Sequence, residues 1–385
     1  MAARVGARSG RITVVVTVAA ALVMVAGVGV ARLVRSPERP GGAPPRSKIC
    51  DIAPADGEAA ITAAIGTCPD GTTVRFPNRA SYHQSSAIKV PRRANLTIDG
   101  NGSTFISSAA NNDGFNPNWM VVDATNVTLH SMSVEGNFKM DGPRSLERMQ
   151  QRFPSGNHFN AGITVYGGKG VTVRDVTIRD TFGDGALVAP SGILPGGAGP
   201  NAGLPHDVRL QRLTITRTAR QGVAVTGGVG VWLEDSRIND SWYLGVDIEI
   251  DVPGQVLRDV HVVGNTFDGT FFGAVALPWP GDGRSVQGIE IRANRTLTPP
   301  DGCGAQISVN ATPGQTATVS DIVTEQNELV TLSRGIVYRN VSSGAIRNNQ
   351  VEKRPGPPCG DPEAAAVMVS ESSGVDVERN TVVNY

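Results

Sequence analysis

The chain has 385 residues and equal numbers of basic and acidic side chains, so it carries no formal net charge. That balance excludes the strongly basic surface with which proteins neutralise nucleic-acid phosphates, and we expect no nucleic-acid partner. Only 18% of the residues are charged, whereas 46 are glycine and 25 are proline, a composition that favours many short strands joined by tight turns over a helical protein.

The N-terminal segment is apolar from Ile12 to Val30 and has arginines at both of its ends. At a helical rise of about 1.5 Å per residue, this run is long enough to cross the hydrocarbon core of a membrane. We therefore predict that residues 1–35 form an uncleaved single-pass signal anchor at the cell membrane, with the bulk of the chain outside the cytoplasm. The alternative is cleavage after Ala31, which would release a secreted protein.

The next segments predict a linker and a small cap. Residues 36–49 are rich in proline, glycine and arginine, as extended linkers are. Residues 57–68 place Ala60, Ile61, Ala64 and Ile65 on one side of a short amphipathic helix. Strand-like segments that end in proline follow at 73–77 and 86–91.

From residue 95 onward one layout recurs: an alternating strand, a polar turn, a second strand, and a small residue that opens a third strand. The spacing of the small residues is typical of solenoid repeats, in which stacked coils bury a core that no single coil could bury. On each third strand the first and third residues after the opening residue should face inward, and the second and fourth outward. The opening residues are Gly162, Gly185, Gly222, Gly245, Gly273, Gly304, Gly335 and Ala366.

This register makes two detailed predictions. At the coil opened by Gly273 it places Val275 and Leu277 on the outside. It also places recurring asparagines in turns, where asparagine tolerates left-handed backbone. These asparagines are Asn265, Asn294, Asn327, Asn348 and Asn380. We therefore predict an all-β, three-sheet parallel β-helix over residues 50–385, capped by the short helix and preceded by the membrane anchor.

A family resemblance adds to this prediction. The stretches GEAAITAAIGTCPDGTTVRFP and SSAIKVPRRANLTIDGNGSTFI resemble the N-terminal cap and first coil of the pectate-lyase-like, or pectin-lyase-fold, superfamily. The repeats that follow are similar to the β-helix region of that superfamily, so the likeness covers about residues 50–385. It implies a right-handed parallel β-helix. It does not imply one activity, because the superfamily includes lyases, glycosidases, esterases, epimerases and non-catalytic adhesins.

The four cysteines fit a compartment outside the cytoplasm, where disulfides form. No C-x-x-C motif occurs, so redox or zinc chemistry through cysteine is not expected. Of the three connectivities that four cysteines allow, the most local one pairs Cys50 with Cys68 and Cys303 with Cys359.

The densest chemical feature is GVDIEID at 245–251, where Asp247, Glu249 and Asp251 alternate and should face outward together. Residues two apart on a strand lie roughly 6.5–7 Å apart, a spacing at which carboxylates share a calcium ion or act as acid and base. We predict Asp247 and Glu249 as a catalytic pair, with a calcium site at all three carboxylates as an alternative. The remaining interpretation is an ordinary solvated strand face.

Asp184 lies in the turn before a third strand, where polygalacturonase-type members of the resembled superfamily carry an aspartate in an N-T-D-G motif. This sequence lacks the Asn-Thr of that motif and the later G-D-D and G-H-G motifs. Because coils stack roughly 4.8 Å apart, Asp184 should lie near equivalent residues of neighbouring coils. We predict Asp184, Arg220 and His158 as further catalytic residues. The predicted substrate-binding residues are Asn160, Gln221, Trp242, Tyr243 and Phe271.

Each of these assignments has a structural alternative. Asp184 would then satisfy backbone donors of its turn, the aromatic residues would cover the core, and His158 would be structural or merely exposed. Against that alternative, long inserts at 139–160 and 190–206 interrupt two coils on the same side. Inserts of this length in a compact repeat usually serve a function, often as walls of a cleft.

Together these features predict a surface-anchored or secreted carbohydrate-active enzyme that cleaves an extracellular or cell-wall polysaccharide. A glycoside hydrolase is favoured over a polysaccharide lyase. A lyase would use Arg220 with His158 or Tyr243 as base, and calcium at Asp247, Glu249 and Asp251. The alternative from another class is a non-catalytic glycan-binding or adhesion β-helix.

Overall fold

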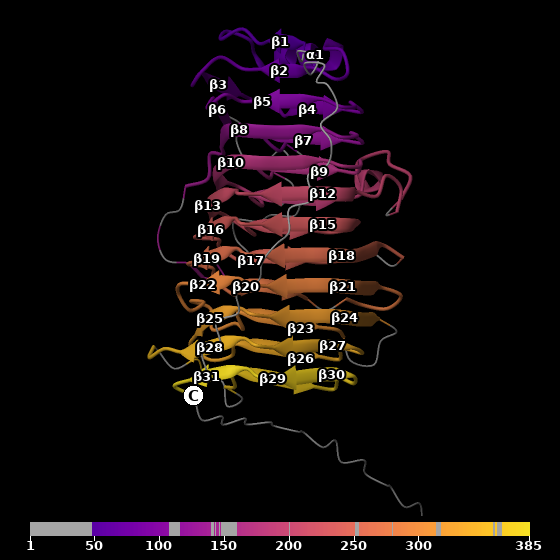
Figure 1. The fold of residues 1–385 in the computed structure, drawn as a ribbon. Coiled ribbons are helices and arrows are strands. Elements are labelled where there is room, and N and C mark those ends of the chain that lie inside the picture. The colour runs from indigo at the N-terminus through magenta and orange to yellow at the C-terminus, as the bar shows by residue number, and fades with distance from the viewer. Residues whose placement is uncertain are drawn as a thin grey trace, which may run out of the picture.

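The chain forms an elongated stack of coils, with α1 at one end and the last strands at the other (Figure 1). The computed structural model describes residues 48–107, 116–139, 142, 144–145, 147, 160–199, 201–250, 254–278, 280–312, 317–356, 359 and 364–385. Every coil pairs in parallel with the coil before and after it, as β11 does with β9 and β14. The predicted parallel β-helix is thereby confirmed.

The predicted anchor, residues 1–35, and most of the predicted linker lie outside the described residues. Within the part of the chain that the structure describes, no helix combines the length and the apolar character needed to cross a membrane.

The strands form two hydrogen-bonded sheets rather than the predicted three. The reason is that a long strand such as β10 pairs with both β12 and β13, so two strips of the stack merge into one sheet. The sheet of ten strands, called the ten-strand sheet below, contains one strand from each coil. Its members are β4 Ile88–Pro91, β7 Trp119–Val122, β9 Ile163–Tyr166, β11 Ala186–Ala189, β14 Val223–Val225, β17 Leu244–Ile248, β20 Gly273–Leu277, β23 Ile307–Asn310, β26 Ile336–Arg339 and β29 Val367–Ser370.

The second sheet contains 21 strands and supplies the other walls of the stack. Its members are β1 Ile49–Asp51, β2 Thr73–Arg75, β3 Ser81–Gln84, β5 Thr97–Asp99, β6 Thr104–Ser107, β8 Thr128–Glu135, β10 Thr172–Thr181, β12 His206–Gln211, β13 Thr214–Thr218, β15 Gly228–Glu234, β16 Arg237–Asn239, β18 Val256–Val263, β19 Thr266–Asp268, β21 Ser285–Arg292, β22 Arg295–Thr296, β24 Thr318–Glu325, β25 Glu328–Thr331, β27 Gly344–Arg347, β28 Gln350–Lys353, β30 Val375–Glu378 and β31 Thr381–Val383.

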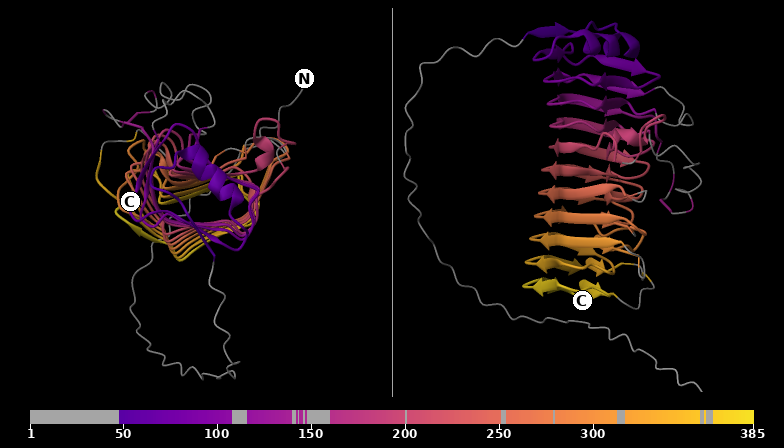
Figure 2. Two further views of the ribbon diagram at one scale, coloured as in Figure 1. Left: turned by 90° about the horizontal axis from the view of Figure 1, so that it is seen from above. Right: turned by 90° about the vertical axis from the view of Figure 1, so that its right-hand side faces the viewer.

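The N-terminal end of the stack is covered by α1, which spans Glu58–Thr67 and lies across the first coil (Figure 2). Ile61 and Ile65 are fully buried in the core below it, whereas Ala60, predicted on the same side, is exposed. Both predicted disulfides are present: Cys50–Cys68 joins β1 to the end of α1, and Cys303–Cys359 joins two loops late in the chain.

The small residues that open strands of the ten-strand sheet lie where one coil presses against the next. A Cβ added to Gly222 would meet Cγ2 of Ile238 at 2.4 Å and the carbonyl oxygen of Gly245 at 2.6 Å. Backbone cannot give way at such a distance without shifting a whole coil. The recurring glycine is therefore a consequence of close coil stacking, and it marks the register that the sequence reveals.

We predict that Gly222→Ala destabilises the protein by about 1–3 kcal/mol, because overpacking displaces neighbouring atoms in a close-packed interior. The matched control is Gly66→Ala in α1, where an added Cβ meets nothing within 4 Å. This control should raise stability by up to about 1 kcal/mol, since alanine is the better helix former. Urea unfolding monitored by circular dichroism measures both changes. Equal effects of the two substitutions would contradict the stacking explanation.

The register prediction was wrong at one coil. Val275 and Leu277 point into the core, and Val275 pairs with Val246 of the preceding coil. Gly273 aligns with Leu244 rather than with Gly245, so it stands one position before the place that Gly222 and Gly245 share. The larger apolar side chains thus occupy the interior, and Ala276 faces outward beside Asp247.

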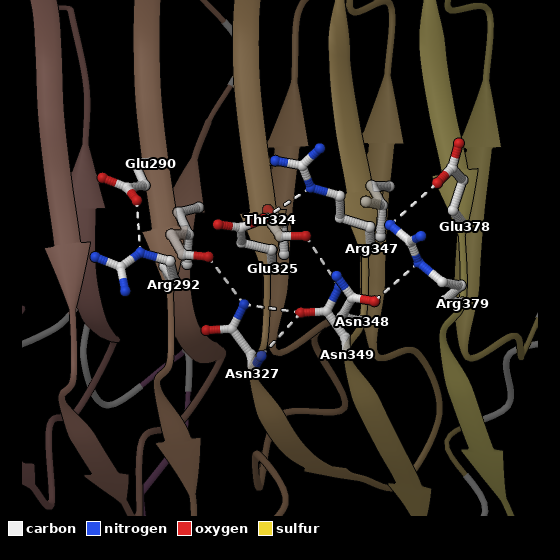
Figure 3. Close-up of polar contacts among 12 residues, drawn as sticks. Glu290, Arg292, Thr324, Glu325, Asn327, Arg347, Asn348, Asn349, Glu378 and Arg379 are labelled. Carbon is white, nitrogen blue, oxygen red and sulfur yellow. Dashed lines mark hydrogen bonds and ion pairs between the residues drawn. The ribbon is translucent and has the colours of Figure 1, made fainter. Parts of the chain in front are cut away.

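The recurring asparagines form an internal ladder (Figure 3). Each side-chain oxygen accepts the backbone N–H of the rung before it, as Asn327 Oδ1 does from Asn294 at 2.9 Å. Each side-chain amide donates to a backbone carbonyl, as Asn327 Nδ2 does to Ile291 at 2.9 Å. The predicted explanation, left-handed backbone, holds only for Asn348, which lies beside the ladder. The rungs are Asn265, Asn294, Asn327, Asn349 and Asn380.

Candidate functional site

A group of charged residues lies on the outward face of the ten-strand sheet, where β11, β14 and β17 run side by side. Asp247 is in β17 and faces outward, because its neighbours Val246 and Ile248 are both in the core. Glu249 follows β17 and has the same orientation. Asp184 precedes β11, and Arg220 and Gln221 precede β14. The fold therefore brings these five predicted residues together, and we call them the carboxylate network.

Arg220 is the centre of the carboxylate network. Its Nη1 lies 3.0 Å from Oδ2 of Asp184, and its Nη2 lies 3.0 Å from Oε1 of Glu249. The same Nη2 lies 4.0 Å from Oδ2 of Asp247. One guanidinium thus contacts carboxyl groups from the coil before it and the coil after it. The side chain of Arg220 is 20% exposed to solvent.

Gln221 connects the same two coils beneath Arg220. Its backbone N–H donates to Oδ1 of Asp184 at 3.1 Å, and its Nε2 donates to Oδ2 of Asp247 at 2.5 Å. Two buried atoms of this pair, Oε1 of Gln221 and Oδ1 of Asp247, receive no hydrogen bond from any described residue. A buried acceptor left without a donor is costly, so a bound proton, a water or a ligand atom is expected there.

The buried carboxyl groups hold protons more tightly than they would in water. Burial raises the pKa of Asp184 to about 6, although the Arg220 charge opposes the shift. Burial and then the adjacent Glu249 carboxylate raise the pKa of Asp247 well above its ordinary value, although the Arg220 charge opposes the shift. The Asp247 carboxyl therefore holds its proton to a higher pH than an aspartate in water does. It lies close to Glu249, since one nitrogen of Arg220 is within 4.0 Å of both carboxyl groups.

Tyr243 lies beside the carboxylate network in the turn before β17. Its ring is half-buried and contacts Phe272 edge-on, with centroids 4.9 Å apart. Burial, followed by the Asp247 charge, raises the pKa of its phenol. The hydroxyl is therefore a neutral hydrogen-bond donor at physiological pH.

The insert at 190–206 lies against the same outward face and contains a short 3-10 helix, η2, at Ser191–Ile193 (Figure 2). Ser191 donates a hydrogen bond of 2.6 Å to Asp123. Ile193 and Leu194 pack on an outward apolar cluster that includes Leu187. This insert therefore covers part of the outward face of the ten-strand sheet.

Part of the insert at 139–160 is described and crosses the turn edge of the stack. Arg144 pairs with Asp301 at 2.5 Å and also donates to the carbonyl of Gly269. These partners lie in coils well beyond the one from which the insert leaves. Asn160, at the end of the insert, receives a hydrogen bond from the Asn116 backbone N–H at 2.8 Å. Its carbonyl accepts from Gly183 at 3.1 Å, so Asn160 positions the turn that carries Asp184.

Two predicted substrate-binding aromatics do not face solvent. Trp242 is 1% exposed and packs edge-on against Phe138, with centroids 5.4 Å apart. Phe271 is 8% exposed and lies against Phe272. The prediction that these rings stack on sugars was wrong, because both are buried against neighbouring aromatic side chains at the turns. Tyr243 keeps the exposure that such contact requires.

Two further predicted residues, His158 and Asp251, lie outside the described residues. Across the residues that are described, no group of three or more histidine, cysteine, aspartate or glutamate side chains is arranged to hold a metal ion. At Asp247 and Glu249 the guanidinium of Arg220 supplies the positive charge that the calcium hypothesis assigned to an ion.

Sequence reasoning did not assign a role to Thr164 and Tyr166 of β9. Both are fully buried on the outward face, and within the described part of the chain their hydroxyls have no hydrogen-bond partner. Burial and then the Asp184 charge raise the pKa of Tyr166. Their outward position in the strand register, next to the insert, was the signal that could have identified them.

Comparisons with known proteins identify the fold. The family model described as "Right handed beta helix region" matches residues 161–382. An uncharacterized protein, YclG of Bacillus subtilis (strain 168), is 25% identical over 257 residues, which are 60% of this chain. The chain spans 42% of the length of that curated relative.

Two solved structures of polysaccharide hydrolases have a similar fold. Polygalacturonase from Erwinia carotovora ssp. carotovora is 12% identical, with a TM-score of 0.56, over 90% of this chain and 97% of that one. Endo-xylogalacturonan hydrolase from Aspergillus tubingensis is 11% identical, with a TM-score of 0.57, over 87% of this chain and 92% of that one. At these identities the likeness shows the fold alone, and it agrees with the resemblance stated from the sequence.

Proposed function

Because the chain belongs to the right-handed β-helix family, we propose that it is a carbohydrate-active protein that hydrolyses an extracellular or cell-wall polysaccharide. The observation that carries the proposal is the nearly buried Asp247 carboxyl, whose pKa is raised, beside the partly exposed Glu249. Glycosidic bonds break when a carboxylic acid protonates the leaving oxygen, and such an acid needs a raised pKa. The fold supports the proposal more weakly, since one fold hosts many functions.

The two carboxyl groups have different positions and therefore different roles. Glu249 retains 21% of its side-chain exposure, whereas Asp247 retains 1%. Glu249 is thus the group that a sugar can reach, and Asp247 supplies the proton from behind it. Arg220 orients Glu249 through the 3.0 Å contact. Tyr243 presents its half-buried ring and neutral hydroxyl on the same edge, where aromatic faces cover the apolar side of sugars.

The geometry favours hydrolysis over elimination. A lyase needs a positive charge to neutralise a uronate carboxylate, and Arg220 was the candidate for that role. Arg220 is instead bound to Asp184 and Glu249 at 3.0 Å each, so its charge is already balanced.

The proposed substrate lies outside the cytoplasm. The apolar run from Ile12 to Val30 supports export of the chain. The Cys50–Cys68 and Cys303–Cys359 disulfides support an oxidising compartment. We propose that the N-terminal segment holds the β-helix at the outer face of the membrane.

A second candidate function is glycan binding without cleavage. The observation in its favour is the burial of the carboxyl groups. Glycosidases use two carboxyl groups that flank the scissile bond, whereas Asp247 is 1% exposed and Glu249 is 21% exposed. The third carboxyl group of the network belongs to Asp184, and it is fully buried.

The test compares Glu249→Gln and Asp247→Asn with wild type for reducing-end release from a panel of polysaccharides and for binding to them. We expect Glu249→Gln to lower turnover by about 10²–10⁴-fold, the usual contribution of a general acid, with binding kept. Asp247→Asn should also lose turnover while gaining stability at neutral pH. A neutral amide can still accept from Gln221 and donate to Glu249, without the cost of a buried charge.

The sign of the stability change depends on pH. Below the ordinary pKa of 3.8, Asp247 is protonated in both the folded and the unfolded states, so Asp247→Asn and wild type should unfold alike. Above it the unfolded state loses the proton first, and wild type alone loses stability as pH rises through the raised folded-state value. The control is Glu290→Gln, a half-buried carboxylate of the other sheet. If wild type binds glycans but releases no reducing ends, and Glu249→Gln binds them in the same way, the binding function is favoured instead.

A further inference from the structure

The charge of the carboxylate network restricts its ligand. Asp184, Asp247 and Glu249 surround a single cation, Arg220. With three carboxyl groups around one guanidinium, the network has no excess positive charge, even with Asp247 protonated. It therefore has no positive charge to offer an anionic group.

The described strands that flank the network add no cation to this balance. Strand alternation places the side chains of β11, β14, β20 and β23 beside the network, and none of those outward-facing side chains is basic. They are Leu187, Ala189, Ala224, Thr226, Ala276, Ser308 and Asn310. On the described strands after β17, the nearest outward cation is Arg339 of β26, which aligns with Asn310 of β23. Three coil spacings separate it from Glu249, roughly 14 Å, which exceeds the Debye length at physiological ionic strength.

The available groups match sugar hydroxyls. Glu249 is a partly exposed acceptor, and Tyr243 is a neutral donor with an apolar ring face. Sugar hydroxyls both donate and accept, so they can pair with Glu249 and with Tyr243, whereas a carboxylate only accepts. A uronate carboxylate placed beside Glu249 would meet like charge and could not donate to it.

We propose that the carboxylate network binds glycans that carry no carboxylate, and that it rejects polyuronates. This inference rests on the proposed function and specifies its substrate class. Specificity of this kind comes from repulsion of the wrong ligand as much as from attraction to the right one. The proposal excludes any activity in which the protein recognises its substrate by a uronate carboxylate.

The test uses oligogalacturonate and its fully methyl-esterified form, which share every ring atom and differ in charge, together with oligosaccharides of galactan, xylan, glucan and mannan. Binding to the exported chain is measured by calorimetry at pH 7 in low and in high salt. We expect every bound ligand to lack carboxylates, with affinity insensitive to salt. Free oligogalacturonate should bind at least about tenfold more weakly than its ester or not at all, because like charges in contact are strongly unfavourable.

The outcomes separate this inference from the proposed function. Oligogalacturonate that binds as well as or better than its ester overturns the inference, and if Glu249→Gln then loses turnover on the panel the proposed function still stands. Failure of the whole panel to bind or to be cleaved overturns the proposed function and the inference with it. Binding confined to uncharged ligands, with turnover lost and binding kept in Glu249→Gln, supports both.

Discussion

Arg220→Met is expected to lower the free energy of unfolding by about 3–5 kcal/mol at pH 7, the range found when one partner of a buried ion pair is removed. Asp184 is fully buried and Asp247 nearly so, and Arg220 compensates both. Methionine keeps most of the side-chain volume but leaves two buried carboxyl groups without a cation. Urea unfolding at several pH values measures the change.

The pH dependence identifies the cause of that loss. The pKa of Asp184 is already raised to about 6, with Arg220 opposing the shift, so removing Arg220 raises it further. Near or below the ordinary value of 3.8 the carboxyl is protonated in both states, and the difference between the variant and wild type should become small. The control is Arg295→Met, whose pair with Glu328 is exposed and should contribute less than about 1 kcal/mol. A loss of the same size at all pH values would point to packing rather than charge.

Asn327→Ala is expected to cost about 2–4 kcal/mol, although Asn327 lies far from the carboxylate network. The substitution removes the acceptor for the Asn294 backbone N–H and for the Asn294 side chain. It also removes the donors to the Ile291 carbonyl and to Asn349. All of these groups are buried. The Asn294 backbone N–H and the Ile291 carbonyl each lose this partner without gaining water, at about 1–3 kcal/mol for a buried polar group. The Asn294 side chain keeps its bond to the Val262 carbonyl, and Asn349 Oδ1 keeps the backbone N–H of residue 327.

The matched control for this prediction is Asn239→Ala. Asn239 lies in β16, is half-buried, and bonds to the exposed side chain of Arg237. Its loss should change stability by less than about 1 kcal/mol, because water replaces the lost contact. Chemical unfolding of both variants compares them directly. If Asn327→Ala were no more harmful than Asn239→Ala, the ladder would contribute little to stability.

The sequence predicted the coil register well wherever packing alone decides it. Each opening glycine such as Gly222 marks a contact between coils that excludes a side chain. The prediction failed at Gly273, where an additional small residue precedes the strand and the interior is decided by Val275 and Leu277 instead. Counting from the larger apolar residues would have given the correct faces, because their burial contributes more than the position of one glycine.

The sequence predicted which residues form the candidate site, but it did not predict how their side chains are arranged. Strand alternation places Asp247 and Glu249 on one face, yet it does not say that both carboxyl groups approach the guanidinium of Arg220. Arg220 has a long side chain with several rotamers, and its choice of Asp184 and Glu249 as partners depends on three coils at once. The burial of Trp242 depends on Phe138, which is more than one coil earlier in the chain. Such contacts are set by the assembled stack rather than by local pattern.

The carboxylate network takes its members from consecutive coils: Asp184 before β11, Arg220 before β14 and Asp247 in β17. A repeat protein can gain or lose a whole coil and still stack, because each coil contacts only its neighbours. Such a change outside residues 184–249 would move the ends of the molecule by roughly 4.8 Å and leave the network intact. The same change inside that stretch would separate Arg220 from a carboxyl group on one side. The chain thus contains one segment that must be inherited as a unit within a molecule whose other coils can be added or removed.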